Sequence, residues 1–154
     1  MKVISGGQTG VDRAALDAAQ ELGLDCGGWC PRGRRAEDGR IPDRYPLRET
    51  ASADYPQRTA ANVRDADATL VLTLGRGTSR GTALTRRLAD EQRKPLLEID
   101  LAAAPPPEPV QAWLEGLAVR TLNVAGPRQS EAADIYARAR EFLLRVLGAR
   151  SDRA

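Results

Sequence analysis

The sequence contains no histidine, and this absence removes the commonest general base and the commonest metal ligand in proteins. Thiols are almost as scarce, since Cys26 and Cys30 are the only cysteines. Their C-x₃-C spacing differs from the redox C-x-x-C motif, and two sulfurs alone do not complete a zinc site. We therefore predict free structural cysteines and no metal site. Any chemistry must then use carboxylates, hydroxyls, arginines or backbone amides.

Lysine is limited to Lys2 and Lys94, so arginine supplies nearly all the positive charge. An arginine-rich chain favours phosphate recognition through bidentate hydrogen bonds, although a compositional bias toward arginine and alanine explains the same counts. The 23 basic and 21 acidic residues nearly balance, which argues against a dedicated nucleic-acid binder.

Long apolar segments are missing as well. No run approaches the roughly 18 residues that a membrane span needs, and the first residues lack the apolar region of a signal peptide. We therefore expect a cytoplasmic protein with neither a membrane nor a nucleic-acid partner. A chain of 154 residues, 42% hydrophobic and 29% charged, is typical of one globular domain.

What the chain does contain is an alternation of strand and helix patterns. Apolar residues from Val11 to Leu22 recur at the spacing of one helical face, and Thr9 with Asp12 has the spacing of a capping box. The alternation predicts a single Rossmann-like α/β domain over residues 1–149, a three-layer sandwich around a mostly parallel sheet, with a frayed tail at 150–154. We expect strands at 3–5, 25–29, 47–50, 68–74, 95–99 and 119–124, and helices that end near residues 22, 65, 93, 117 and 148.

Three predicted strands are followed by special loops: SGGQTG at 5–10, GRGTSRGT at 75–82 and AGPRQS at 125–130. The carboxyl ends of parallel strands lie at one edge of a sheet, so these loops should meet there. Each loop opens a helix, whose free amides and positive dipole end suit an anion. The pattern predicts a phosphate-bearing small-molecule ligand. The first loop lacks G-x-G-x-x-G and the chain has no Walker lysine, which disfavours classical dinucleotide binding and P-loop ATP hydrolysis.

A long arginine-rich loop, residues 31–44, is too charged to be an incidental connection, and we expect it to form a wall of the site. Arg34 and Arg35 are candidates to clamp phosphate, with solvation or pairing to Glu37 or Asp38 as the alternative. Trp29 either stacks on a ligand ring or packs in the interior.

Longer motifs then indicate a family. SGGQTGVDRAALDAA, GGWCPRGRRAEDGRIPDRYPL, NVRDADATLVLT and LNVAGPRQSE resemble the molybdenum carrier family of the Rossmann-like SLOG superfamily, which also holds YpsA-type proteins and LOG phosphoribohydrolases. The resemblance covers about residues 2–147. It implies a binding or carrier protein for a phosphate-bearing ligand, either molybdenum cofactor (molybdopterin) as cargo or a nucleotide-like molecule. It also implies that the first glycine loop, the arginine-rich loop and the GT-bearing loop line the pocket.

The LOG relationship raises a hydrolase acting on a nucleotide or nucleotide sugar as the alternative. LOG enzymes carry P-G-G-x-G-T-x-x-E, and here Thr85 stands where the glutamate would be, so the glycosidase activity does not transfer. Asp12 and Glu37 remain the acid–base candidates of that alternative, and the leading hypothesis assigns no catalytic residue. A third hypothesis makes the loops a protein interface.

We also expect a homo-oligomer. The predicted ligand-binding residues are Gly6, Gly7, Gln8, Thr9, Gly10, Asp12, Arg13, Trp29, Arg34, Arg35, Glu37, Gly77, Thr78, Ser79, Gly81, Thr82 and Arg128.

Overall fold

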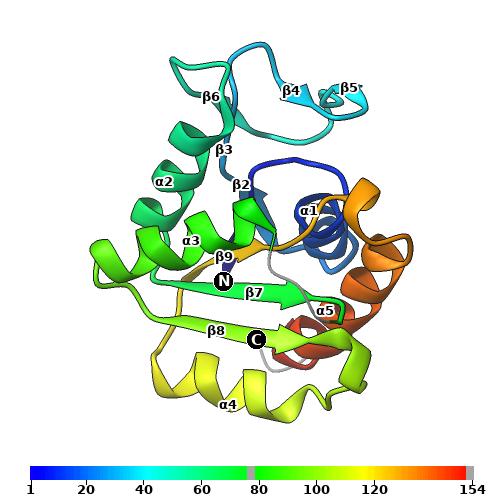
Figure 1. Cartoon of the computed structure of the whole chain (residues 1–154). Helices are drawn as coiled ribbons and strands as arrows, with labels where there is room; N and C mark the ends of the chain where they lie inside the picture. The colour runs from blue at the N-terminus through cyan, green and yellow to red at the C-terminus, as the bar shows by residue number, and fades with distance from the viewer. Residues whose placement is uncertain (76–78, 152–154) are drawn as a thin grey trace.

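The computed structural model describes residues 1–75 and 79–151, with side chains described through residue 149. Its centre is a five-stranded sheet in the order β2-β1-β9-β7-β8, in which every neighbouring pair is parallel. This arrangement confirms the predicted Rossmann-like α/β sheet (Figure 1). The strands are β1 (Lys2–Ile4), β2 (Asp25–Gly27), β7 (Ala68–Thr73), β8 (Leu96–Asp100) and β9 (Thr121–Ala125).

Helices cover both faces of the sheet. They are α1 (Val11–Glu21), α2 (Tyr55–Asp65), α3 (Arg80–Glu91), α4 (Glu108–Gly116) and α5 (Ile135–Ser151), with short 3₁₀ turns η1 (Leu101–Ala103) and η2 (Gln129–Glu131). Buried residues of α1, α4 and α5 share one hydrophobic core with the sheet. The other face carries α2 and α3, which lie together on one side of the strands (Figure 1). None of the described helices is long and apolar enough to cross a membrane.

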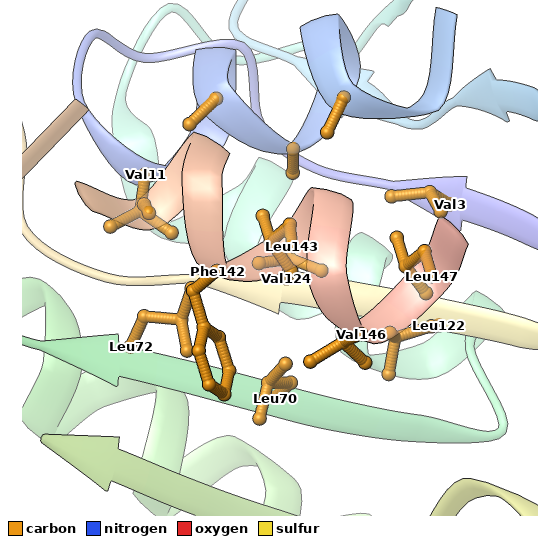
Figure 2. Close-up of a cluster of buried hydrophobic side chains, with 14 of the residues drawn as sticks. Val3, Val11, Leu70, Leu72, Leu122, Val124, Phe142, Leu143, Val146 and Leu147 are labelled. Atoms are coloured by element: carbon orange, nitrogen blue, oxygen red, sulfur yellow. The ribbon is translucent and has the colours of Figure 1, made fainter. Parts of the chain in front are cut away.

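The two faces of the sheet differ in polarity. On the α5 side, leucine and valine side chains of β7 and β9 meet Phe142 and its neighbours, all at most 4% exposed (Figure 2). Strand residues alternate between faces, so Thr69 and Asn123 point away from this core toward α2 and α3. Both are buried, and the Asn123 Nδ2 donates a 3.2 Å hydrogen bond to Thr69 Oγ1. The polar face is where the site described below is located.

The arginine-rich loop packs on the outside of α1. It contains the hairpin of β4 (Arg35–Ala36) and β5 (Gly39–Arg40), and it is followed by β6 (Arg48–Glu49), which pairs in parallel with β3 (Trp29–Cys30). A small second core of Leu16, Cys30, Ala36, Ile41 and Tyr45 fastens the loop to the helix.

Three details differ from the sequence prediction. The strand expected at 25–29 is interrupted at Gly28, where φ is 123° and a Cβ would lie 2.3 Å from the Ser5 carbonyl oxygen. The capping box is wrong, because Gly10 is the N-cap of α1 and no side chain caps it. Gly148 does not end the last helix, which continues to Ser151.

Candidate ligand-binding site

The loops that follow β1 and β9 interlock at the carboxyl edge of the sheet. The Gln129 backbone N–H donates a 3.1 Å hydrogen bond to Thr9 Oγ1, and the Val11 N–H donates a 3.2 Å bond to the Pro127 carbonyl. Gly10 has φ 79°, and a Cβ there would lie only 2.4 Å from the Pro127 oxygen. Glycine is therefore required at Gly10 so that the two loops can pack against each other.

A cavity of about 520 Å³ opens beside this junction, between the loops, α2, α3 and the polar face of the sheet. Its volume falls in the range of roughly 300–1,000 Å³ that is typical of small-molecule sites. The start of α3 lines it together with the loops after β1 and β9, so all three strand-end regions meet as the topology predicts. Of the predicted binding residues, five line it: Gln8, Asp12, Ser79, Gly81 and Arg128. Gly77 and Thr78 lie outside the described residues.

Helix α2 supplies one wall that the sequence reading missed. Tyr55, Arg58, Thr59 and Asn62 all line the cavity. Their i, i+3, i+4, i+7 spacing places them on one face of the helix. This row of polar residues on a helix that packs against the sheet was the sequence signal that could have assigned them to the site. Asn62, the last of the four, is only 3% exposed.

Arg58 is the most buried cation of the cavity, with a side chain 11% exposed. Its Nη1 donates a 2.8 Å hydrogen bond to the Gly6 carbonyl and lies 3.5 Å from Asp12 Oδ2. A Cβ at Gly6 would lie 2.2 Å from this nitrogen, so the glycine leaves room for the guanidinium. The cation is thereby fixed at the cavity wall.

Asp12 braces the first glycine loop, because its Oδ2 accepts a 3.1 Å hydrogen bond from the Gln8 backbone N–H. The predicted bracing role is present, without the Thr9 cap. Burial raises the pKa of this carboxyl above its usual value, although Arg58 and the Gln8 N–H oppose the shift. Asp12 is therefore a shielded carboxyl on the cavity wall, paired with a cation.

The first glycine loop offers fewer free amides than the sequence suggested, because those of residues 7, 8 and 9 are engaged. The Gly7 N–H faces Ser5 Oγ at 3.5 Å, and the Thr9 N–H donates to Gln8 Oε1 at 3.0 Å. The missing side chain at Gly7 makes room for protein and not for a ligand, because a Cβ there would clash with the side chains of Leu47 and Ile41. The loop is bound within the protein.

The amino end of α3 is more open. Ser79 is its N-cap, and its Oγ accepts a 3.1 Å hydrogen bond from the Thr82 N–H. Among the described residues, no acceptor pairs with the backbone N–H of Arg80 or Gly81. Both residues line the cavity, and the Arg80 side chain is exposed. This helix end therefore brings a positive charge, and donors that no described residue pairs with, to the cavity lining.

Glu37 lies outside the cavity lining, where its hydrogen bonds connect three segments of the chain. Its carboxylate accepts hydrogen bonds from Thr9 Oγ1, from the Ser130 N–H at 3.1 Å and from Ser130 Oγ at 2.6 Å. Burial alone would raise the pKa of Glu37, but these hydrogen bonds and the Arg128 charge lower it below its usual value. The neighbouring Asp38 is held by Arg13 in a bidentate pair of 2.7 and 2.8 Å. Neither acid is a free solvated turn residue.

Arg34 is also placed differently from the prediction. Its guanidinium donates to the carbonyls of residues 41, 42, 45 and 47, at 2.7 to 3.4 Å, inside its own loop. Arg35 is exposed and bonds Ala53 O at 3.3 Å, and Trp29 bonds Asp65 through its indole N–H at 2.7 Å. These three side chains do not line the cavity described above. Arg34 organises the loop rather than a ligand.

An all-parallel sheet with helices on both faces and a cavity at its carboxyl edge places the molecule in the class of Rossmann-like α/β proteins. Residues 3–147 match the model of the circularly permutated YpsA SLOG family, and the chain belongs to that family. It is similar to a crystal structure from Syntrophus aciditrophicus SB described as a "putative molybdenum carrier protein". The two share 42% identity with a TM-score of 0.88, over 95% of this chain and 94% of that one. A search of curated proteins found no match.

Proposed function

We propose that this protein binds and carries a small molecule that bears a phosphate or similar anionic group. The observation that supports this most is the cavity wall at the start of α3, where the N–H groups of Arg80 and Gly81 lack acceptors among the described residues. The helix dipole and the Arg80 cation add positive potential at that wall, and Arg58 supplies a cation on the α2 side of the same cavity. An anionic group seated there would complete these donors.

The related crystal structure carries the description "putative molybdenum carrier protein". Molybdenum cofactor, a pterin with a terminal phosphate, is accordingly one candidate cargo, and a nucleotide-like molecule is the other. A protein interface in place of a ligand site has less support. Among the described residues, Leu117 is the one large apolar side chain that is exposed.

Calorimetric titration with inorganic phosphate, pyrophosphate and mononucleotides tests this proposal. We expect Arg80→Ala to weaken binding roughly tenfold, because it removes a charge-assisted contact, while the melting temperature stays unchanged. Arg87→Ala is the matched control, since it removes an exposed arginine about two turns further along α3. Equal affinities for both variants and wild type, or no binding by wild type, would contradict the proposal.

The position of Asp12 favours a hydrolase as the second candidate. Burial raises the pKa of this cavity-lining carboxyl, as a general acid requires. Incubation of wild type with mononucleotides and nucleotide sugars, followed by chromatography, separates the two functions. Unchanged ligands favour the carrier. Hydrolysis by wild type, together with an Asp12→Asn variant that binds but does not turn over, would establish the enzyme.

A further inference from the structure

One little-exposed polar side chain in the cavity lining has groups that no other described residue pairs with. Three buried polar side chains line the cavity, Asn62, Thr85 and Asn123, each 3% exposed. Asn62 accepts from the Trp29 N–H at 2.8 Å and donates to the Trp29 carbonyl at 3.0 Å. Thr85 Oγ1 donates to the Gly81 carbonyl at 2.9 Å. The first two are therefore paired with backbone.

Asn123 is different. Its Nδ2 donates one hydrogen bond, to Thr69 Oγ1, and no described residue donates to its Oδ1 or accepts its second N–H. Because these amide groups have no protein partner, a ligand that completes their hydrogen bonds is preferred over one that leaves them unpaired. The amide offers an acceptor and a donor side by side to whatever occupies the cavity.

The place of Asn123 in the fold sets it apart from the anion-binding wall. It stands two residues before the end of β9, which is about 7 Å below the sheet edge. Thr85, which also lines the cavity, lies one helical turn, about 6 Å, beyond Gly81. A ligand that reaches both ends must be longer than a phosphate alone.

The walls of the cavity include apolar surface as well, from Leu84, Pro56 and Ala125. A flat ring buries its faces against such surface and keeps its polar edge for the amide. A heterocycle with adjacent N–H and C=O groups matches the acceptor and donor of Asn123. Guanine and pterin rings share this cis-amide edge.

We propose that Asn123 determines specificity by hydrogen bonding the cis-amide edge of a heterocyclic ring, whose phosphate lies at the amino end of α3. This inference rests on the proposed binding function and adds to it the residue that recognises the ring of the ligand. The ring inserts between α2 and α3 against the polar face of the sheet, and the anion stays at the sheet edge.

The test is calorimetry of wild type with four probes: GMP, a pterin phosphate, ribose phosphate, and purine riboside monophosphate, whose ring carries acceptors only. We expect GMP or the pterin phosphate to bind at least tenfold more tightly than the other two, and the tighter of them identifies the source of the ring. If ribose phosphate binds as tightly as GMP and the pterin phosphate, the proposed ring contact is refuted and the proposed anion site is not. If no probe binds, the proposed function itself fails.

Two variants assign the preference to the residue. Asn123→Ala is expected to reduce GMP and pterin phosphate affinity about tenfold and to leave ribose phosphate affinity unchanged. Thr69→Val removes the same internal hydrogen bond from a residue outside the cavity lining. It should match the loss of melting temperature but keep most of the ring preference. If both variants lose the preference for GMP and pterin phosphate over ribose phosphate equally, Asn123 has only a structural role. If either variant does not fold, the wild-type affinities for the four probes decide the proposal.

Discussion

Replacing Arg34 by alanine should destabilise the protein without acting on the ligand directly. The side chain is 10% exposed and donates four hydrogen bonds to backbone carbonyls of the arginine-rich loop. A hydrogen bond that involves a charged group contributes about 1.5–3 kcal/mol, and bonds within one network do not add fully. We therefore expect a loss of about 3 kcal/mol in the free energy of unfolding. In a domain of this size, that corresponds to about 6–12 °C in melting temperature.

Thermal unfolding followed by circular dichroism measures this loss. Arg35→Ala is the matched control, because the neighbouring arginine is exposed and makes one 3.3 Å bond to Ala53 O, and such surface changes stay within about 0.5 kcal/mol. Arg34→Lys keeps the charge but loses the planar fork, so it should recover only part of the stability. If Arg34→Ala melts within about 2 °C of Arg35→Ala, the carbonyl network does not hold the loop and the reasoning is refuted.

Two further predictions concern the junction of the loops. Gly10→Ala should lower the free energy of unfolding in urea by at least about 1–2 kcal/mol more than Gly33→Ala does. Both glycines have positive φ (79° and 83°), but only at Gly10 would a Cβ lie against the Pro127 oxygen. Equal losses would mean that the two loops separate easily. Glu37→Gln tests the carboxylate tie through pH. Since folding lowers the pKa of Glu37, its contribution is fully present above pH 4.5, the usual value, and is lost as the pH falls through the lower folded pKa. The stability difference from wild type should vanish in acid, whereas a difference that persists there, or that the exposed Glu141→Gln variant reproduces, would exclude this origin.

Much of the sheet was predictable from sequence because β1, β7 and β9 are short, largely apolar segments followed by loops that contain glycine. Parallel topology then placed three strand ends at one edge without any knowledge of side chains. Helix α2 ends at Asp65, as predicted. The rotation of α2 about its axis was not predicted, so Arg58 and Asn62 were not assigned to the site.

The arginine-rich loop shows what sequence patterns do not contain. Arg34 was assigned to a ligand by residue type, but its partners are carbonyls 7 to 13 positions away, at distances that depend on the path of the whole loop. The hairpin of β4 and β5 has only two residues in each strand, too few for a period-2 signal. Such loops acquire their structure from contacts that are non-local and largely polar.

The same distinction changes the role of the first glycine loop. Its glycines allow other parts of the protein, and not a ligand, to approach the backbone closely. Gly6 leaves room for Arg58, Gly7 for Leu47 and Ile41, and Gly10 for the Pro127 carbonyl. With these contacts made and the Gly7 and Thr9 amides engaged, the loop is a rigid support. The donors that no described residue pairs with lie elsewhere in the cavity lining, at the start of α3 and on Asn123. We therefore expect substitutions in the glycine loop to act first on stability, and substitutions at Arg80 or Asn123 to act first on affinity.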